Sequence, residues 1–343
     1  MIKKAILTGG GRATRLRPIT TTINKHLIPL ANKPMIFHAI EKVVKAGINE
    51  IFINTNPGET ELQKVVGDGS KWGIKITFFE QVGGPQGIAH VVKQAQNFIG
   101  DDPFIFYLSD NIVLADLNNL VEKFSSGHFD CMLALSKVTD PERFGVPVFN
   151  DKGELIEVLE KPQNPPNNFA VTGIYIYGGQ LFWEAFDNIK PSARGEYEIS
   201  DIHSYLLKTG KKVGHEEITG WWKDTGKPED LLLANKLLMD TNQVKVEVGK
   251  NVQRVDGAKL IEPVIIGDDC ILENCVIGPY VTIGNNSLIK NAQIQNSIIF
   301  EKVQIDCDKK IGYSLIGKGA QVIEDKQTEY HRLVIGDCTV VEF

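Results

Sequence analysis

The chain has 343 residues, of which 42% are hydrophobic and 23% charged, with a formal net charge of −6. The length predicts two domains, and the ordinary globular composition with a negative balance argues against a nucleic-acid binder. No apolar run approaches the ~18 residues that a membrane span needs, so we expect no membrane partner.

The first predicted element is a buried strand at residues 2–8, which leads into the turn Leu7–Pro18, LTGGGRATRLRP. The surrounding segment is basic, because residues 1–45 hold nine Lys or Arg and one acid, Glu41. Backbone N–H groups of a glycine-rich turn bind phosphate, and local positive charge attracts a small polyanion. The turn fits neither GxGxxG nor GxxxxGK[ST], which disfavours a dinucleotide fold and a P-loop ATPase.

A helix follows, for which Asn32 is the expected N-cap, Pro34 lies near the first turn and Gly47 ends the apolar pattern. Further strands are expected at EIFINTN, IKITFFEQ and PFIFYLSDN. Alternating strands and helices predict an α/β fold, a Rossmann-like, mostly parallel sheet with helices on both faces. Ligands of such sheets bind at the carboxyl ends of strands, where the polar clusters of this sequence fall.

The rhythm changes after about residue 255. Isoleucines recur six apart at 265, 271, 277, 283 and 289, and again at 299, 305 and 311. A six-residue period predicts a parallel β-helix of stacked coils, each burying its isoleucine against the next. We therefore expect a first domain at 1–242, a polar, aperiodic connector at 243–258 and a β-helix at 259–343, with a role in assembly or regulation.

Cysteine and histidine spacing excludes two further classes of site. The five cysteines form no CxxC pair, and the seven histidines show no HExxH-like spacing. With no signal peptide, this predicts reduced thiols, a cytoplasmic protein and no zinc site.

Several motifs together carry a more specific resemblance. GGGRATRLRP followed by NKHLIPLANKPMI resembles the loop of the sugar-1-phosphate nucleotidyltransferases, usually GGxGTRLxP with a Lys about ten residues on. The motifs EQVGGPQGIAHVV, YLSDN, EKP, VTGIYIY, RGEYEISD and WWKDTGKPEDL follow in the family's order across residues 1–240. The resemblance is closest to members that transfer thymidylate to glucose 1-phosphate, in the longer form with a C-terminal left-handed β-helix.

The resemblance implies the fold of the nucleotide-diphospho-sugar transferases and a reaction. An oxygen of glucose 1-phosphate would attack the α-phosphorus of dTTP in line, giving dTDP-glucose and pyrophosphate, with Mg²⁺ shared by Asp110 and Asp224. Arg15 and Lys25 would bind the β- and γ-phosphates, and Lys161, assisted by Arg194, the attacking phosphate.

It also implies two sets of contacts. Gln81 with Gly87 would read a pyrimidine edge, Glu160 would accept from sugar hydroxyls, and Tyr175 and Trp222 would serve packing. The expected nucleotide-binding residues are Leu7, Gly9, Gly10, Gly11, Arg12, Ala13, Thr14, Arg15, Gln81, Pro85, Gly87, Ser109 and Asp110. The expected sugar-phosphate residues are Asn111, Gly145, Glu160, Lys161, Val171, Thr172, Gly173 and Arg194.

The sequence departs from the family pattern at Arg12 and Ala13, at Ser109 and at Phe144. We predict an ordinary negative φ at Ala13 and a mobile Arg12 side chain that closes over the phosphates. Alternatives remain: UTP as nucleotide, a cytidylyl- or adenylyltransferase, a non-catalytic regulatory subunit, and an acetyltransferase in the β-helix using His331. A homo-oligomer with contacts through the β-helix is also expected.

Overall fold

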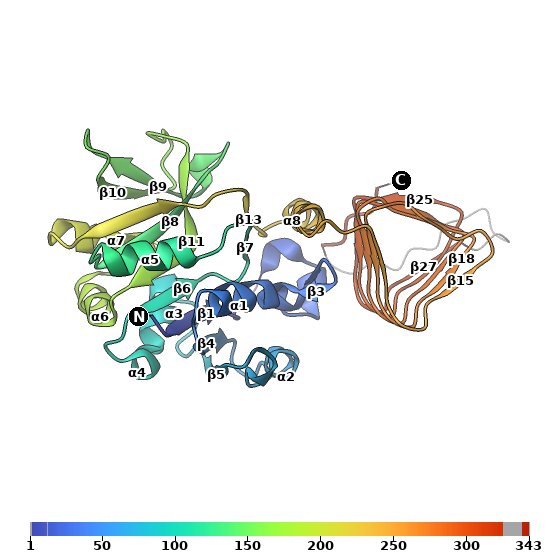
Figure 1. The fold of residues 1–343 in the computed structure, drawn as a ribbon, viewed down its shortest axis with the longest axis horizontal. Helices are drawn as coiled ribbons and strands as arrows, with labels where there is room; N and C mark the ends of the chain where they lie inside the picture. Colours follow the sequence, from blue (N-terminus) through green and yellow to red (C-terminus); the bar gives the residue numbers. More distant parts are fainter. Residues whose placement is uncertain (1, 12, 325–337, 343) are drawn as a thin grey trace. The chain divides into compact units, whose positions relative to one another are not determined.

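The computed structural model describes residues 2–11, 13–324 and 338–342, so the expectations for Arg12 and His331 fall outside the described residues. The chain forms two compact units, each built from separate stretches of sequence (Figure 1). The first unit is Met1–Gly11 with Ile36–Lys223, and the second is Arg12–Met35 with Asp224–Phe343.

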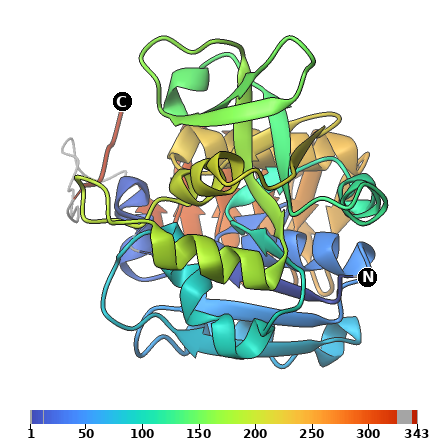
Figure 2. The ribbon, with the colours of Figure 1, turned by 90° about the vertical axis from the view of Figure 1, so that its left-hand side faces the viewer.

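The first unit is built on a mixed nine-stranded sheet. Its parallel part has the order β6-β1-β4-β5, and β11 runs antiparallel to β6, β8 and β9. The hairpin of β9 and β10 stands out from the rest of this unit (Figure 2, green). The strands are β1 (Lys4–Thr8), β4 (Glu50–Thr55), β5 (Lys75–Glu80), β6 (Phe104–Tyr107), β8 (Cys131–Lys137), β9 (Gly145–Phe149), β10 (Leu155–Glu160), β11 (Phe169–Tyr177) and β12 (Val213–Glu217).

Helices flank this sheet. They are α1 (Met35–Lys45), α2 (Glu61–Val66), α3 (Ile88–Gln94), α4 (Gln96–Ile99), α5 (Asn118–Ser126), α6 (Gly179–Asn188) and α7 (Ile199–Lys208), with short 3₁₀ turns η4 (Ser70–Trp72) and η5 (Pro141–Arg143). In α1, Ile36, Ile40 and Val43 are fully buried, as its helical apolar spacing predicts. The prediction that Asn32 is the N-cap of this helix was wrong. Asn32 lies in the turn of a hairpin, and α1 begins only at Met35.

The second unit contains a left-handed parallel β-helix, which Figure 1 views along the stack of coils. Its three sheets have the orders β14-β17-β20-β23-β26, β15-β18-β21-β24-β27 and β16-β19-β22-β25. The strands are β14 (Val246–Val248), β15 (Gln253–Val255), β16 (Lys259–Leu260), β17 (Val264–Ile266), β18 (Ile271–Glu273), β19 (Val276–Ile277), β20 (Val281–Ile283), β21 (Leu288–Lys290), β22 (Gln293–Gln295), β23 (Ser297–Ile299), β24 (Gln304–Asp306), β25 (Lys310–Gly312), β26 (Leu315–Ile316) and β27 (Gln321–Ile323).

Two details of the predicted β-helix need correction. Residues 243–258 are no separate connector, because β14 and β15 within them pair with β17 and β18 as an opening coil. The isoleucines six apart do not all stack on one another either. Val264 pairs with Val281 and Ile265 with Thr282, so a coil here is 17 residues long rather than 18, and the six-residue pattern drifts out of register.

The second unit also holds α8 (Pro228–Thr241) and the segment before α1. Pro228 at the first helical position and Glu229 and Asp230 in the first turn favour the start of α8. The segment carries η1 (Thr14–Leu16), η2 (Ile19–Thr21), η3 (Lys25–Leu27) and the hairpin of β2 (Pro29–Leu30) and β3 (Lys33–Pro34). Two short strands, β7 (Asn111–Val113) and β13 (Trp222–Asp224), pair with each other.

Two class predictions can be compared with the structure. All five cysteines are free, four of them buried and Cys338 exposed. In the part of the chain that the structure describes, every helix is too short or too polar to cross a membrane.

Candidate active site

The glycine-rich turn follows β1, and its geometry is set by the neighbouring strand β4. Gly9 N donates to Asn54 Oδ1 at 3.1 Å, and Gly11 N donates to Asn56 Oδ1 at 2.9 Å. Asn56 Nδ2 returns a hydrogen bond to Gly11 O at 3.2 Å. A Cβ on Gly10 would lie only 2.8 Å from Asn54 Nδ2, so glycine lets the turn approach these amides.

Asn54 and Asn56 were not among the predicted site residues. The available signal was their place at the end of β4, which pairs with β1 in parallel and so brings both carboxyl ends to one edge. Their side chains occupy two of the N–H groups that we expected phosphate to use. The turn is therefore held in shape by asparagine amides before any ligand binds.

Ser109, which precedes the predicted metal ligand Asp110, is hydrogen-bonded to Thr8 at the end of β1. Its N–H donates to Thr8 Oγ1 at 2.9 Å, its hydroxyl donates to Thr8 O at 2.6 Å, and the residue is fully buried. A glycine, as in many relatives of the resembled family, could not make the second bond. Ser109 is thus a structural tie beside Asp110.

Asn111 orients the neighbouring groups. Its Nδ2 donates to Asp110 Oδ1 at 3.0 Å, and its Oδ1 accepts from Trp222 Nε1 at 2.8 Å. Tyr107 Oη donates to Asn111 O at 2.8 Å. A Cβ on Gly173 would lie 2.8 Å from Asn111 Nδ2, so Gly173 packs directly on this amide. The network fixes one carboxylate oxygen of Asp110.

The second unit brings together Asp224 and Arg15. A Cβ on Gly226 would lie 3.3 Å from Asp224 Oδ2 and 3.6 Å from Arg15 Nη1, so both groups border one glycine. Thr225, next to Asp224, is fully buried, and its Oγ1 lies 3.3 Å from Met35 Sδ. Lys25 opens η3, which is capped by Asn24 through its bond from His26 N.

Ala13 contradicts its prediction. Its φ is +41° and its ψ +45°, in the left-handed region, rather than at the negative φ that we expected. Its carbonyl accepts from Leu16 N at 3.0 Å and from Thr20 Oγ1 at 2.8 Å. These bonds hold the strained conformation, which costs an alanine roughly 1 kcal/mol relative to glycine.

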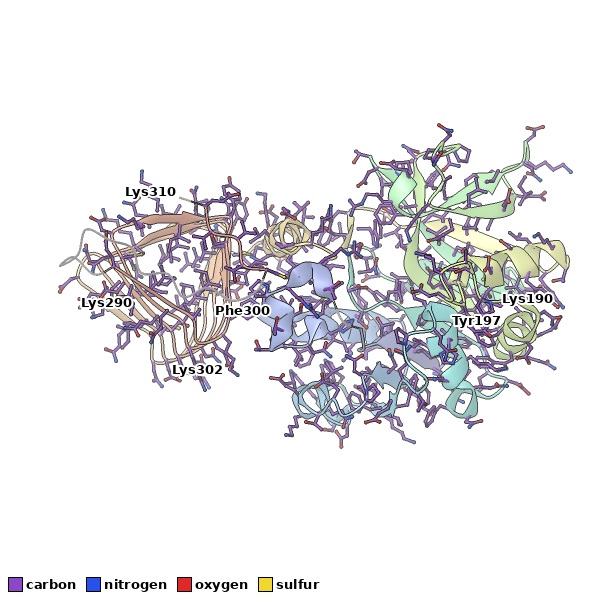
Figure 3. All side chains as sticks on the ribbon, turned by 180° about the vertical axis from the view of Figure 1, so that it is seen from behind. Lys190, Tyr197, Lys290, Phe300, Lys302 and Lys310 are labelled. Atoms are coloured by element: carbon purple, nitrogen blue, oxygen red, sulfur yellow. The ribbon has the colours of Figure 1, made fainter. Side chains whose placement is uncertain are left out.

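The predicted base-reading loop, residues 81–87, is fastened to the predicted sugar-side segment. Gln81 Nε2 donates to Gly84 O at 3.3 Å, and Tyr197 N donates to Gln86 O at 2.8 Å. Gly87 has a φ of +94°, and a Cβ there would lie 2.5 Å from Tyr197 O, so only glycine fits. The ring of Tyr197, which Figure 3 labels, packs on that of Phe186, with 4.7 Å between the ring centroids.

Three predicted sugar contacts meet in the sheet. Gly145 pairs with Glu160 and with Val171, and a Cβ on Gly145 would lie 3.7 Å from Glu160 Oε2. Thr172 differs, because its buried hydroxyl donates to Ala134 O at 2.9 Å and serves the sheet. Leu7 is likewise fully buried in β1, whereas Pro85 lies on the exposed loop.

Both predicted phosphate-binding cations of the first unit are held by carboxylates. Lys161 Nζ lies 2.9 Å from Glu160 Oε1, and Lys161 itself has a φ of +46°. Arg194 Nη2 lies 2.9 Å from Glu198 Oε1, which also accepts from Ser192 Oγ at 2.8 Å. Glu198 is a residue that our sequence reasoning missed, although its spacing of four from Arg194 is that of a common ion pair.

Three residues near Glu160 and Glu198 have shifted pKa values. Burial, with the charges of Glu198 and Glu160, raises the pKa of Asp201 above its ordinary value. Burial and the Glu160 charge also raise the pKa of Tyr175. Hydrogen bonding to Glu198 raises the pKa of Arg194. Carboxylates and cations thus gather around Glu160, a composition suited to a substrate with both hydroxyls and a phosphate.

The chemistry of the donors fits Mg²⁺. Over residues 2–11, 13–324 and 338–342, no three His, Cys, Asp or Glu side chains gather as a ready metal site. Mg²⁺ typically binds through one or two carboxylates together with substrate phosphates, and Asp110 and Asp224 supply such oxygens. Their joint action on one metal stays a prediction.

Comparisons with known proteins show the family of this chain. Residues 4–241 match the family model described as nucleotidyl transferase, and residues 260–342 match a GMPPB C-terminal domain. The chain is 39% identical to a low-salt glycan biosynthesis nucleotidyltransferase, Agl11, of Haloferax volcanii, covering 97% of this chain and 98% of that protein. It is 34% identical to a glucose-1-phosphate thymidylyltransferase of Streptomyces griseus, with 97% and 98% covered. A solved structure titled as a putative glucose-1-phosphate thymidylyltransferase from Bacillus anthracis is 38% identical, with a TM-score of 0.65 over 70% of this chain and 96% of that one.

Proposed function

The chain belongs to the nucleotidyl transferase family, and on that premise we propose that it transfers dTMP from dTTP to glucose 1-phosphate, giving dTDP-glucose and pyrophosphate. The observation that carries the proposal is the meeting of Gly145, Glu160 and Val171 beside the cation of Lys161. This arrangement offers a carboxylate to sugar hydroxyls next to an ammonium for the sugar's phosphate. The full-length relative from Streptomyces griseus supports the choice of substrates.

The reaction needs placement and charge neutralisation more than proton transfer. An oxygen of the sugar phosphate forms a bond to the α-phosphorus, and the bond from that phosphorus to the β-phosphate oxygen breaks. Lys161 and Arg194 would orient the attacking phosphate. Arg15 and Lys25 would neutralise the charge that accumulates on the departing pyrophosphate. Mg²⁺ held by Asp110 and Asp224 would screen the phosphates during the attack.

The ion pairs of Lys161 and Arg194 give the proposal a further feature. Lys161 and Arg194 now engage Glu160 and Glu198, so the incoming phosphate must compete for both cations. Glu160 would then accept hydrogen bonds from hydroxyls of the hexose instead of pairing with Lys161. Binding of the sugar phosphate is thus an exchange of partners between groups that are already adjacent.

A second candidate substrate is UTP. Gln81 Nε2 is engaged by Gly84 O, which leaves the amide oxygen as acceptor for the ring N–H that thymine and uracil share. This contact does not separate the two bases. A cytoplasmic location and a homo-oligomeric state, the latter testable by light scattering, remain parts of the proposal.

A substrate matrix tests the function. Purified protein with Mg²⁺ is offered dTTP, UTP, CTP, ATP or GTP against several hexose 1-phosphates, and pyrophosphate release is measured. We expect the highest kcat/KM for dTTP with glucose 1-phosphate. A higher value for UTP would move the assignment to the second candidate, and no release from any pair would overturn the transferase proposal.

A further inference from the structure

One outer face of the β-helix is buried. In the sheet β14-β17-β20-β23-β26, the interior cluster of the coils contains the flanking residues of β17 and β20 and the last residue of β23, namely Val264, Ile266, Val281, Ile283 and Ile299. The middle residues Ile265, Thr282 and Ile298 therefore point outward, yet they are only 8%, 0% and 0% exposed. On the sheet of β18, β21 and β24, by contrast, the outward residues are mostly polar and partly exposed.

The covering elements belong to the same unit. Helix α8 contacts β23, and Lys236 Nζ on α8 lies 3.4 Å from the ring centroid of Tyr280. Ile19 of the segment 13–35 approaches Gly317, where a Cβ would lie 3.2 Å from its Cδ1. Phe300, labelled on the flank of the β-helix in Figure 3, is 3% exposed without belonging to the interior cluster.

The hairpin of β2 and β3 is bonded to both of its neighbours. Its two turn residues, Ala31 and Asn32, have φ values of +47° and +58°. Ala31 N donates to Asn235 Oδ1 of α8 at 2.8 Å. Asn32 Nδ2 donates to Ile283 O of the β-helix at 2.8 Å, a bond between residues 251 apart in sequence. The tip of the hairpin is therefore fixed to α8 and to β20.

The hairpin adjoins residues assigned to the triphosphate. Lys25 opens η3, Ile28 N donates to Lys25 O at 3.1 Å, and β2 begins one residue later. At the other end of the hairpin, Met35 N donates to Ile28 O at 3.0 Å, and Met35 Sδ meets Thr225, the neighbour of Asp224. Displacement of the tip would thus be transmitted to both Lys25 and Asp224.

We propose that Asn32 is a positioning residue through which the β-helix holds Lys25 in place for the nucleoside triphosphate. This inference rests on the proposed function and assigns the β-helix a part in the reaction besides assembly. In this proposal the β-helix does not contact substrate. It acts through hydrogen bonds that run from β20 to the hairpin of β2 and β3 and from there to η3. A change in the β-helix coil at Ile283 should accordingly weaken binding of the triphosphate.

The test compares Asn32→Gly and Asn32→Asp with Asn274→Gly. Gly and Asp both tolerate a positive φ, so these variants remove the donor without new backbone strain. Asn274 is a matched control, because it also has a positive φ, +45°, and its Nδ2 also makes a 2.8 Å bond, to Asn291, at a different corner of the β-helix. For each protein, kcat and KM are measured for dTTP and for glucose 1-phosphate separately.

We expect both Asn32 variants to raise the KM for dTTP about fivefold to tenfold, with the KM for glucose 1-phosphate unchanged. Asn274→Gly should change neither constant. Equal effects of the Asn32 and Asn274 variants, or a rise in both KM values, would show a general structural role and overturn the positioning proposal.

A second readout is independent of turnover. Amide hydrogen exchange of Leu27 and Ile28, which donate to Asn24 O and Lys25 O, reports the order of η3 in the free enzyme. We expect exchange at least about tenfold faster in Asn32→Gly and unchanged in Asn274→Gly. Faster exchange with no pyrophosphate release by any protein would support the hairpin tether and overturn the proposed function. Unchanged exchange in Asn32→Gly would overturn the tether.

Discussion

Lys161 combines a positive φ with an ion pair to the adjacent Glu160. A lysine in the left-handed region costs on the order of 1 kcal/mol, and such strain concentrates where a side chain has to be aimed. Since the pair is half-exposed, its own contribution to stability is small. On the proposed function, this conformation aims the ammonium at the phosphate of glucose 1-phosphate.

Replacing Lys161 with alanine should therefore separate activity from folding. We expect turnover to fall by roughly 10² to 10³, because one charge-stabilising donor is lost, and the free energy of unfolding to change by less than about 0.5 kcal/mol. Lys137→Ala is the matched control, since Lys137 pairs with Glu217 at 3.1 Å and is similarly exposed. Steady-state kinetics and urea unfolding measure the two effects, and near-normal turnover in Lys161→Ala would refute the assignment.

Ala13 offers a test of strain in the phosphate turn. Ala13→Gly should raise the free energy of unfolding by up to about 1 kcal/mol, because glycine adopts the observed φ of +41° without a Cβ clash. Ala115→Gly serves as control and should lower stability or leave it unchanged, since Ala115 is absent from the positive-φ residues of the described chain. Chemical denaturation of both variants decides the matter, and a destabilised Ala13→Gly would contradict the strain argument.

His203 predicts a pH dependence. Burial lowers its pKa from the usual 6.5 to about 3, and its Nε2 lies 2.6 Å from Tyr177 Oη. Between these two pKa values the unfolded chain binds a proton at His203 and the folded chain does not. The contribution of neutral, buried His203 to the free energy of unfolding is therefore present above pH 6.5 and is lost as the pH falls toward about 3. Below pH 6.5, wild type should lose about 1.4 kcal/mol more per pH unit than His203→Gln. Parallel stability curves for the two proteins would exclude this role.

At the scale of elements, the end of β4 supports the glycine turn. Asn56→Ala removes both bonds to Gly11, so we expect the KM for dTTP to rise severalfold and stability to fall by about 1 kcal/mol. Asn150→Ala is the control, because Asn150 also accepts backbone bonds in an exposed turn, from Lys152 and Glu154. The control should lose comparable stability and no affinity for dTTP. A similar KM for the two variants would show that the amide has no part in shaping the turn.

The elements also show what sequence patterns could predict. Strands ending at Thr8 and Thr55, and α1 with its apolar spacing, follow from local periodicity that tertiary packing reinforces. The hairpin at Asn32 did not follow, because its turn depends on bonds to residues more than 200 positions away. The positive φ of Ala13 was missed for a different reason, because local turn bonds to its carbonyl override the preference of alanine.

At the scale of the whole molecule, residues from both ends of the sequence share one unit. Ile298 points outward from the β-helix and is fully buried. Ile298→Ala should cost 2 to 5 kcal/mol, about the value for a buried isoleucine, and should weaken dTTP binding by loosening the cover formed by α8 and the segment 13–35. Ile156→Ala, at a residue 51% exposed in β10, should cost under about 0.5 kcal/mol. If Ile298→Ala lost stability but kept its affinity for dTTP, the packing of Ile298 would have no part in dTTP binding, contrary to this prediction.

The domain boundaries are where sequence reasoning was least informative. Composition and rhythm change near residue 255, which predicted a break between a catalytic part and a β-helix. Compactness in space instead groups Arg12–Met35 with Asp224–Phe343. A linear pattern cannot reveal an early segment that packs against a late one, because neither carries a local signal of its partner.

The bond between Asn32 and Ile283 has a consequence for biosynthesis. A ribosome adds about 5–20 residues per second, so the nascent hairpin waits roughly ten seconds to a minute before its acceptor has been translated. During that interval the first unit can build its sheet, but the segment of Arg15 and Lys25 has no β-helix to dock on. On the proposal above, tight binding of the triphosphate would therefore arise only after that coil is made, and an mRNA cut short before the coil of Ile283 would yield a protein that binds dTTP more weakly.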